Sequence, residues 1–460
     1  MPQKESGAAP EERAELDRED EEERELVRPP DVNQESNRSA TRLELFFDLA
    51  FVLFVARCAD ILAKEETWSG ALTFTAVLTV GWWAWASTTL YANRFDTDDA
   101  IFRLLMLVGM AGVVAMAASV DKLDAATSRW FALAYVVLRV VLVVGYLRAW
   151  RALPDARRTI RPYLFAHCAG AAVWLISLAV PTPARYVLWG IGVGVDLVGP
   201  TLAARLKDGI PLHMEHLPER FGLFVILVLG ESVAAAVTGV HDGGWKAGVV
   251  ATGGFGFVVA AALWWSYFDL SGGVAKRRLL QEGHDRTRQG VHDFYVYAHL
   301  PVAVSLAAVA VGLEHAIVHG ADDHLSTGTR AVLGIGLAGY LASAALIQAV
   351  LARHVRAALL WPGTGVLLVL IACTLDLRPS VLLAQLAAIM VAGVTTGIAQ
   401  HRAGEIRPAQ QLSHDDLLRA GSGEVAQRPD GACPFGHQGE LRRGRADRHG
   451  CLLQLVTRIE

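Results

Sequence analysis

The stretch RLELFFDLAFVLFV, from Arg42 to Val55, decides the fold of this 460-residue chain. It is the first of a long series of apolar runs. The whole chain is 53% hydrophobic and 19% charged, with a mean hydropathy of +0.34. Soluble domains carry about 25% charged residues, and here many of the charges gather at the two ends of the chain. The composition therefore excludes a soluble globular protein and favours a helical membrane protein.

Twelve apolar runs follow one another between residues 41 and 400. Each is about 20 residues long, which is the length of a helix that crosses a bilayer. Strands of a membrane barrel would be about 10 residues long and would alternate strictly in polarity. The runs therefore predict membrane-spanning helices at 43–62, 70–91, 101–120, 129–150, 163–180, 184–204, 220–240, 247–270, 294–318, 328–350, 356–374 and 379–399.

The opening stretch has a second copy. RFGLFVILVLGESV, from Arg220, matches it in register at Arg, Leu, Phe, Leu and Val, and a Trp-Trp pair follows each copy at 82–83 and 264–265. Such spacing indicates an internal repeat, in which two parallel halves each hold six helices. The predicted all-α organisation is an acidic disordered tail at 1–40, membrane halves at 41–205 and 206–400, and a polar disordered tail at 401–460.

Three motifs make the sequence recognisable. RLELFFDLAFVL, WWAWASTTLYANRFDTDD (Trp82 to Asp99) and HLPERFGLFVILVLGES (His216 to Ser232) resemble the bacterial low temperature requirement protein A (LtrA) family. The resemblance covers most of residues 41–400. It implies an integral bacterial membrane protein with repeated hydrophobic segments. The family name describes a requirement for growth in the cold, and it supplies no substrate or catalytic residue.

The loops predict how the chain lies in the membrane. Lys and Arg are more frequent in the loops on the N-terminal side, which places both termini in the cytoplasm. The expected partners are the lipid bilayer of the bacterial inner membrane and an unknown small solute or ion. A net charge of −4 offers no basic surface for nucleic acid. The five cysteines form no CxxC pair, and no cofactor or metal is predicted.

Ionisable side chains within the apolar runs are the candidate binding residues, because a charge at mid-bilayer costs about 2.5–3.5 kcal/mol. Glu231 lies near the midplane of the seventh segment. Glu44 and Asp48 are four residues apart on one face of the first segment, where two carboxylates can share a proton. His299 suits a proton relay. The competing interpretation is structural, with each group capped, paired or neutralised by burial.

Asp48 and Glu231 are expected at similar depths, facing each other between the halves as an acidic site for a proton or cation. Arg139 and Asp196, midway along the fourth and sixth segments, are a candidate buried pair. Other charged residues at the segment ends are interpreted as gating or structural groups. These are Arg94, Asp96, His216, Glu219, Arg220 and Asp269.

These patterns favour a secondary transporter or proton-coupled permease. A membrane scaffold or stress-adaptation factor, whose buried charges only hold helices together, is the second hypothesis. An enzyme ranks last, because no nucleophile–base pair or metal-ligand set is complete. The aspartates of NRFDTDD lack the glycine and distal Glu of a calcium loop.

Overall fold

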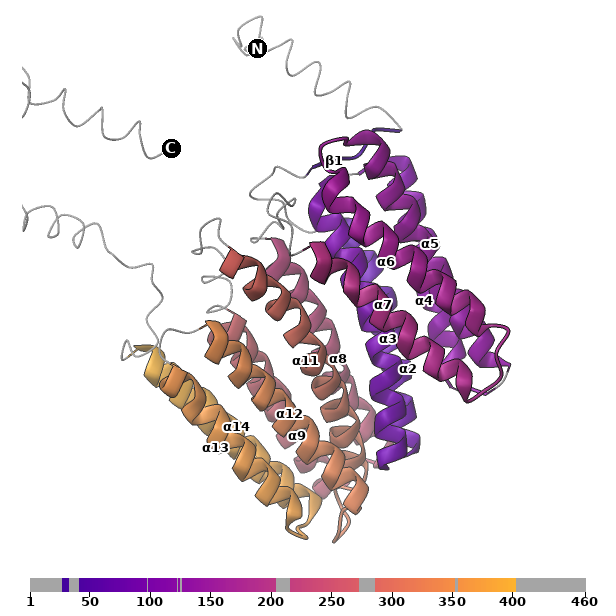
Figure 1. The fold of residues 1–460 in the computed structure, drawn as a ribbon. Helices are drawn as coiled ribbons and strands as arrows, with labels where there is room; N and C mark the ends of the chain where they lie inside the picture. The colour runs from indigo at the N-terminus through magenta and orange to yellow at the C-terminus, as the bar shows by residue number, and fades with distance from the viewer. Residues whose placement is uncertain are drawn as a thin grey trace, which may run out of the picture. The chain divides into compact units, whose positions relative to one another are not determined.

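The computed structural model describes residues 27–32, 41–96, 98–121, 123–124, 126–203, 216–272, 286–351 and 355–402. These residues form twelve α-helices, one π-helical segment and two two-residue strands, so the fold is all-α (Figure 1). The helices are α2 (Arg42–Lys64), α3 (Trp68–Arg94), α4 (Ala100–Ser119), α5 (Thr127–Ala152), α6 (Arg157–Ser177), α7 (Ala184–Ala203), α8 (His216–Asp242), α9 (Ala247–Trp265), α11 (Arg286–Val318), α12 (Thr327–Leu351), α13 (Val355–Thr374) and α14 (Pro379–Arg402).

Each apolar run corresponds to one of these helices, which confirms the predicted order of elements. The eighth run, predicted as one helix over 247–270, is divided. Its α-helix ends at Trp265, and the π-helical segment η1 (Ser266–Gly272) continues it. π-Helical segments are rare and occur often at functional sites.

Local hydrogen bonds explain where the first helices begin. Thr41 caps α2 in a capping box, since its side chain accepts from the Glu44 N–H while the Glu44 carboxylate accepts from the Thr41 N–H. Thr67 caps α3 through the N–H of Gly70, and Asp99 caps α4 through the N–H of Phe102.

Seven of the described helices are long and apolar enough to cross a membrane: α4, α5, α8, α9 with the start of η1, α11, α12 and α14. The chain is therefore a multi-pass membrane protein. Helix α2 falls outside this set because of its charged residues, Asp48, Arg57 and Asp60 among them, although the rest of the helix is strongly apolar. Helix α3 is rich in Trp and Thr, which are less hydropathic than the aliphatic residues.

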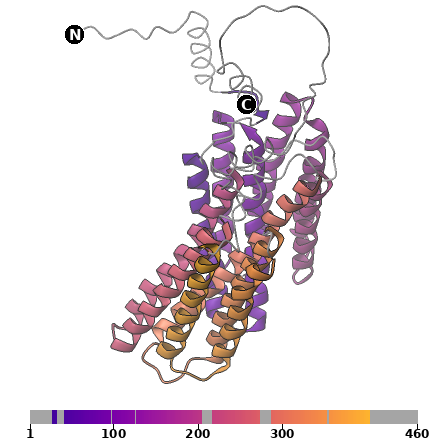
Figure 2. The same ribbon diagram turned by 90° about the vertical axis from the view of Figure 1, so that its left-hand side faces the viewer.

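The helices form two bundles that pack in the same order. In the first bundle α2 contacts α3 and α4, and α4, α5, α6 and α7 pack in succession. In the second bundle α8 contacts α9 and α11, and α11, α12, α13 and α14 pack in succession. Helix α9 also packs against α14, whereas the corresponding helices α3 and α7 border a cavity of about 710 Å³. The two sets of helices can be followed by colour in Figure 2.

The two bundles meet along four helices. Helices α2 and α3 of the first bundle contact α8 and α11 of the second. We call this interface the seam. It carries the two copies of the repeated motif, because α2 begins at Arg42 and α8 contains Arg220.

A short N-terminal arm, residues 27–32, packs beside the first bundle. Its strand β1 (Asp31–Val32) pairs antiparallel with β2 (Phe95–Asp96), which follows α3. Arg28 donates its backbone N–H to Asp99 and its guanidinium to the Asp98 carbonyl. The prediction of a disordered tail over 1–40 therefore does not hold for residues 27–32, because their backbone finds hydrogen-bond partners there. Residues 1–26 and 33–40, and all of the predicted tail beyond Arg402, lie outside the described part of the chain.

Asp99 joins this arm to two helices. Its carboxylate accepts two hydrogen bonds from Arg148 of α5, at 3.2 and 2.7 Å, besides those from Phe102 and Arg28. Burial alone would raise the pKa of Asp99, but the hydrogen bonds from Arg148 and the Phe102 N–H outweigh it and hold the pKa below its usual value of 3.8.

We expect Asp99→Ala to lower the stability of the protein by about 1 kcal/mol from the lost cap, and further from the lost pair with Arg148. Asp99→Asn keeps a side-chain acceptor and loses only the charge, so its loss is smaller. Because the pKa of Asp99 is lowered, the charge-dependent part is present above pH 3.8 and disappears as the pH falls through the lowered pKa. Thermal unfolding in detergent at several pH values measures this. A wild-type advantage over Asp99→Asn that persists unchanged at the lowest pH contradicts the assignment.

Candidate functional site

A buried ion pair lies at the centre of the seam. Arg220 of α8 donates from Nη2 to Oδ1 of Asp48 on α2 at 2.9 Å, and both side chains are at most 2% exposed. Trp85 of α3 donates its indole N–H to the same oxygen at 2.8 Å. Asp48 thus accepts one hydrogen bond from a helix of each bundle. The first residue of the second motif copy is paired with the seventh residue of the first copy.

Aromatic rings separate this pair from its surroundings. The Trp85 ring stacks on Phe224 with 4.2 Å between ring centroids and meets Phe221 edge-on at 4.9 Å. All three rings are buried. Excluding water strengthens the attraction between the charges, although removing both ions from water is itself costly.

The site keeps polar atoms that are not hydrogen-bonded to any other described residue. These are Oδ2 of Asp48, Oε1 of Glu44, and Nε and Nη1 of Arg220. Glu44 is one helical turn before Asp48 and only 1% exposed. Its other oxygen closes the capping box with Thr41. Glu44 therefore has a structural role in starting α2, and it also adds a second carboxylate beside Asp48.

Glu231 lies in a different cluster of the seam. It is half-buried on α8, and its charge interacts with Asp60 of α2 and Glu314 of α11. Three acidic side chains from three helices thus influence one another, although Asp60 also pairs with Arg57 at 2.8 Å and the charge of His315 acts on Glu314. Neighbouring carboxylates repel one another when all are ionised, and a bound proton or cation relieves that repulsion.

The structure does not bring Asp48 and Glu231 into one site. Asp48 is level with Arg220, and Glu231 follows Arg220 by eleven residues along α8, which is about 16 Å at 1.5 Å per residue. The expectation that the two acids face each other at similar depths assumed that the two motif copies begin at the same level. The Asp48–Arg220 pair instead offsets the copies by six residues, which is about 1.7 turns at 3.6 residues per turn.

His299 of α11 is fully hydrogen-bonded. Its Nδ1 lies 2.6 Å from the Tyr295 carbonyl oxygen and its Nε2 lies 2.8 Å from the Tyr267 hydroxyl. These partners suit a neutral ring that donates from Nδ1 and accepts at Nε2, a tautomer assigned from the hydrogen bonds. The ring is 2% exposed and meets Phe221 edge-on at 4.9 Å. His299 therefore packs against the aromatic shield of the central pair.

Arg94 lies at the end of α3 near the seam. Its guanidinium sits over the Tyr163 ring, 4.6 Å from the centroid, and interacts with the charge of Asp293 on α11. Arg94 is 6% exposed. It thus supplies a second charged link between the bundles, close to the N-terminal arm.

The structure places the other predicted gating residues by the elements that carry them. Asp96 pairs through its backbone with Asp31, and its side chain lies outside the described residues. His216 begins α8, and its side chain is likewise not described. Glu219 and Asp269 are exposed, in the first turn of α8 and in η1.

One seam residue was missed by sequence reasoning. Glu66, between α2 and α3, accepts hydrogen bonds from His315 of α11 at 2.7 Å, from Ser326 at 3.1 Å, and from Thr329 of α12 at 2.9 and 2.7 Å. We call this group the Glu66 clasp. Its members are about 250–260 positions apart in the sequence, so no local pattern links them.

A separate polar network lies inside the first bundle and confirms the predicted Arg139–Asp196 pair. Arg139 Nη1 is 3.5 Å from Oδ2 of Asp196, which also accepts from the Tyr135 hydroxyl at 3.0 Å. His167 Nδ1 is 3.3 Å from Oδ1, and Arg139 donates to Ser87 at 3.0 Å. The network ties α3, α5, α6 and α7 together.

Comparison with known proteins identifies the family. The family model described as bacterial low temperature requirement A protein (LtrA) matches residues 39–395, more than half of the chain. The chain belongs to the LtrA family. An uncharacterized protein of Rhizobium meliloti is 26% identical over 286 residues, which are 60% of this chain and 69% of that protein. No solved structure matches the chain.

The family match covers every cluster of the seam, since all of them lie between residues 39 and 395. In this LtrA-family protein the ionisable seam groups come from α2, α3, α8 and α11. Within the part of the chain that the structure describes, no three His, Cys, Asp or Glu residues are placed to hold a metal ion.

The central pair yields a stability prediction for the LtrA-family protein. Asp48→Ala leaves Arg220 buried without its partner, so we expect a loss of about 3–5 kcal/mol. The double variant Asp48→Leu with Arg220→Met replaces both charges by apolar groups and recovers much of that loss. Thermal unfolding in detergent compares the three proteins.

The control is Arg57→Ala. It breaks an exposed pair with Asp60 on the same helix, worth about 0–1 kcal/mol. A single Asp48→Ala variant that is as stable as Arg57→Ala would show that the buried pair contributes nothing to folding.

Proposed function

We propose that this protein is a secondary transporter or proton-coupled permease for a small solute or ion in the bacterial inner membrane. One observation carries the proposal. Several ionisable groups with partners in both bundles lie in or beside the seam, namely the Asp48–Arg220 pair, the Glu231 cluster, Arg94 with Asp293, and Glu66 with His315.

Placing charges in the seam is costly, at about 2.5–3.5 kcal/mol for each charge at mid-bilayer on insertion scales. A seam needed only for adhesion can be built from apolar and small residues. Charges on a surface between two halves suit a protein in which those halves move relative to one another and expose the charges in turn.

We further propose that all twelve helices cross the membrane as two parallel six-helix repeats. The equivalent packing order in the two bundles supports this, because α2 to α7 contact one another as α8 to α14 do. Helices α2, α3, α6, α7 and α13 pack within these bundles among helices that are apolar enough to span. An even number of spans puts both termini on one side, and the Lys and Arg bias favours the cytoplasm.

Glu231 is the proposed coupling residue. It is half-buried, and the charges that act on it, those of Asp60 and Glu314, are both acidic. Asp48, already neutralised by Arg220, suits a role in which the pair opens and re-forms between states. A proton or cation that binds near Glu231 would change the repulsion among the three carboxylates. It would thereby shift the equilibrium between two arrangements of the seam helices.

The second candidate is a non-transporting scaffold or cold- and stress-adaptation factor. The full hydrogen bonding of His299 and the aromatic enclosure of the central pair favour it, because both are typical of a packed structural interface. An enzyme remains the lowest-ranked proposal, since the sequence motifs contain no complete nucleophile–base pair or metal-ligand set.

Proton-coupled uptake in liposomes tests the proposal. Purified protein is reconstituted with the pH-sensitive dye pyranine inside, and pools of amino acids, sugars, organic acids and inorganic cations are added outside. We expect the wild type to change the internal pH with at least one pool. Glu231→Gln, which cannot release a proton, is expected to abolish the change, and Asp48→Asn to reduce it.

Glu65→Gln is the matched control, because Glu65 is an exposed carboxylate in the loop between α2 and α3. It is expected to behave as the wild type. Wild-type liposomes that match empty liposomes with every pool contradict transport and favour the scaffold. Size-exclusion profiles of each variant separate a loss of coupling from a loss of folding.

The topology has its own test. Fusing alkaline phosphatase or a fluorescent protein after Glu460 reports the side of the membrane on which the C-terminus lies. We expect fluorescence and no phosphatase activity. Phosphatase activity from the fusion contradicts the even span count with a cytoplasmic N-terminus.

A further inference from the structure

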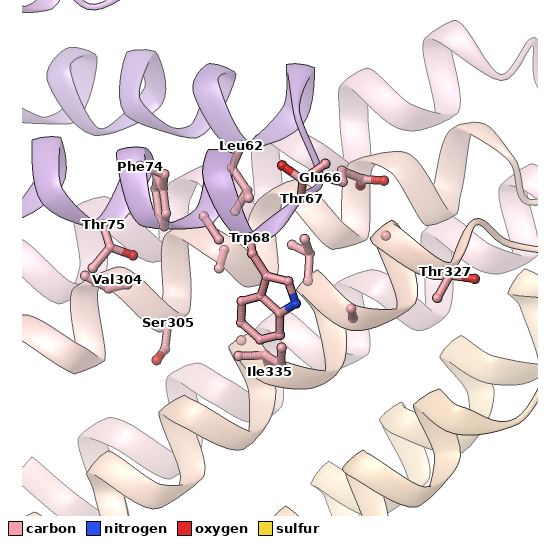
Figure 3. Close-up of a pocket in the computed structure, with 16 residues that line it drawn as sticks. Leu62, Glu66, Thr67, Trp68, Phe74, Thr75, Val304, Ser305, Thr327 and Ile335 are labelled. Atoms are coloured by element: carbon pink, nitrogen blue, oxygen red, sulfur yellow. The ribbon is translucent and has the colours of Figure 1, made fainter. Parts of the chain in front are cut away.

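A second feature of the seam is a cavity of about 320 Å³ beside the Glu66 clasp (Figure 3). Its walls come from both bundles: the end of α2 and the start of α3 on one side, and α11 and α12 on the other. It runs along α3 from Trp68 to Thr75, which is about 10 Å at 1.5 Å per residue.

Most of the side chains that line the cavity are apolar. Leu62, Phe74 and Val304 supply larger walls, while Ala71, Ala308 and Ala331 leave the space between them. Gly336 also borders it. The narrow, apolar shape suits a flexible hydrocarbon chain.

The charged lining residue, Glu66, lies at the clasp end, whereas Thr75 and Ser305 contribute hydroxyl groups farther along the cavity (Figure 3). Both carboxylate oxygens of Glu66 are engaged by three donors, His315, Ser326 and Thr329, and the single Thr329 hydroxyl lies within hydrogen-bond distance of both oxygens. Burial alone would raise the pKa of Glu66, but the hydrogen bonds from His315 and Thr329 outweigh it and lower the pKa. Glu66 therefore stays ionised at neutral pH with its charge engaged, and the cavity presents no unpaired charge to a ligand.

Gly328 allows the clasp to sit this close to α12. A Cβ at this position would lie 2.8 Å from the Glu66 Cβ and 2.9 Å from its backbone oxygen. The start of α12 thus approaches the loop between α2 and α3 directly, and the cavity is closed at that end by backbone and by the clasp.

The side of the cavity that is open to the surroundings is lined by exposed apolar side chains. Trp68 is 76% exposed, and Ile335 on the opposite wall is 48% exposed. Leu72, one turn after Trp68, is 70% exposed. In a multi-pass membrane protein such an apolar flank faces lipid. Tryptophan near a helix end typically marks the level where acyl chains meet headgroups.

We propose that this cavity binds one acyl chain of a bilayer phospholipid, with the headgroup at the level of Trp68. The chain lies between the two bundles and contacts both, so its presence or absence changes the packing of the seam beside the clasp. The proposal does not depend on transport, because the cavity and the clasp hold for a scaffold equally.

Photo-cross-linking tests the site. The full-length protein is reconstituted in phosphatidylethanolamine–phosphatidylglycerol vesicles containing an analogue with a diazirine in one acyl chain. Irradiation and peptide mass spectrometry then locate the label. We expect label on Val304 and Ala308 of α11, which line the cavity and are only partly exposed, besides the general label on outward-facing side chains.

The matched variants are Ala331→Phe and Ala342→Phe, which add the same ring at two exposed alanines of α12. Only Ala331 lines the cavity. The label on Val304 and Ala308 should be lost in Ala331→Phe and retained in Ala342→Phe. Thr75→Phe fills the cavity from α3 and serves as the second blocking variant if Ala331→Phe does not fold.

Three results would overturn the proposal. The first is label on Val304 and Ala308 that persists at the wild-type yield in both blocking variants. The second is label confined to outward-facing residues in the wild type. The third is a cross-link between two copies of the protein at this cavity, formed by a bifunctional protein cross-linker in a parallel sample, which would identify the occupant as another protomer.

Discussion

The ion pair of Asp48 and Arg220 determines how the two bundles meet. Neither charge is tolerable alone at this depth, so each helix must present its charged residue at the level of the other. That requirement sets the offset between α2 and α8. It also places Trp85 of α3 on the same oxygen, and through Phe221 it reaches His299 of α11. All four seam helices are thus held in register by contacts that begin at one carboxylate.

Most of the helices could be predicted from the sequence, because they depend on the length of the apolar runs and on capping residues close to each helix start. A 20-residue apolar run has few alternatives to a helix in lipid, and Thr41 or Asp99 marks a helix start within one turn. The candidate site is visible only in part. Asp48, Arg220 and Glu231 stand out as ionisable residues in or beside apolar runs, but their pairing is a long-range property. Asp48 and Arg220 are 172 residues apart, and counting along each helix assigned the depths without the offset that the pair imposes.

Polar groups away from the seam follow a different pattern. Around Asp196 three other side chains are close enough to satisfy both carboxylate oxygens. The three acids near Glu231 are compensated only in part, because Asp60 pairs with Arg57 and the charge of His315 acts on Glu314, while the charges that act on Glu231 are acidic. The Asp196 network therefore ties the helices of the first bundle together through a carboxylate whose two oxygens are both engaged.

The N-terminal arm has a consequence for how the protein is made. Arg28 bonds to Asp99 and, through its carbonyl, to Arg148, which are 71 and 120 residues later in the chain. On the ribosome, the arm has no partner until α3 has been completed, and its last partner emerges with α5. The arm thus remains undocked while the first helices enter the membrane, and its docking marks the point at which α3, α4 and α5 have assembled.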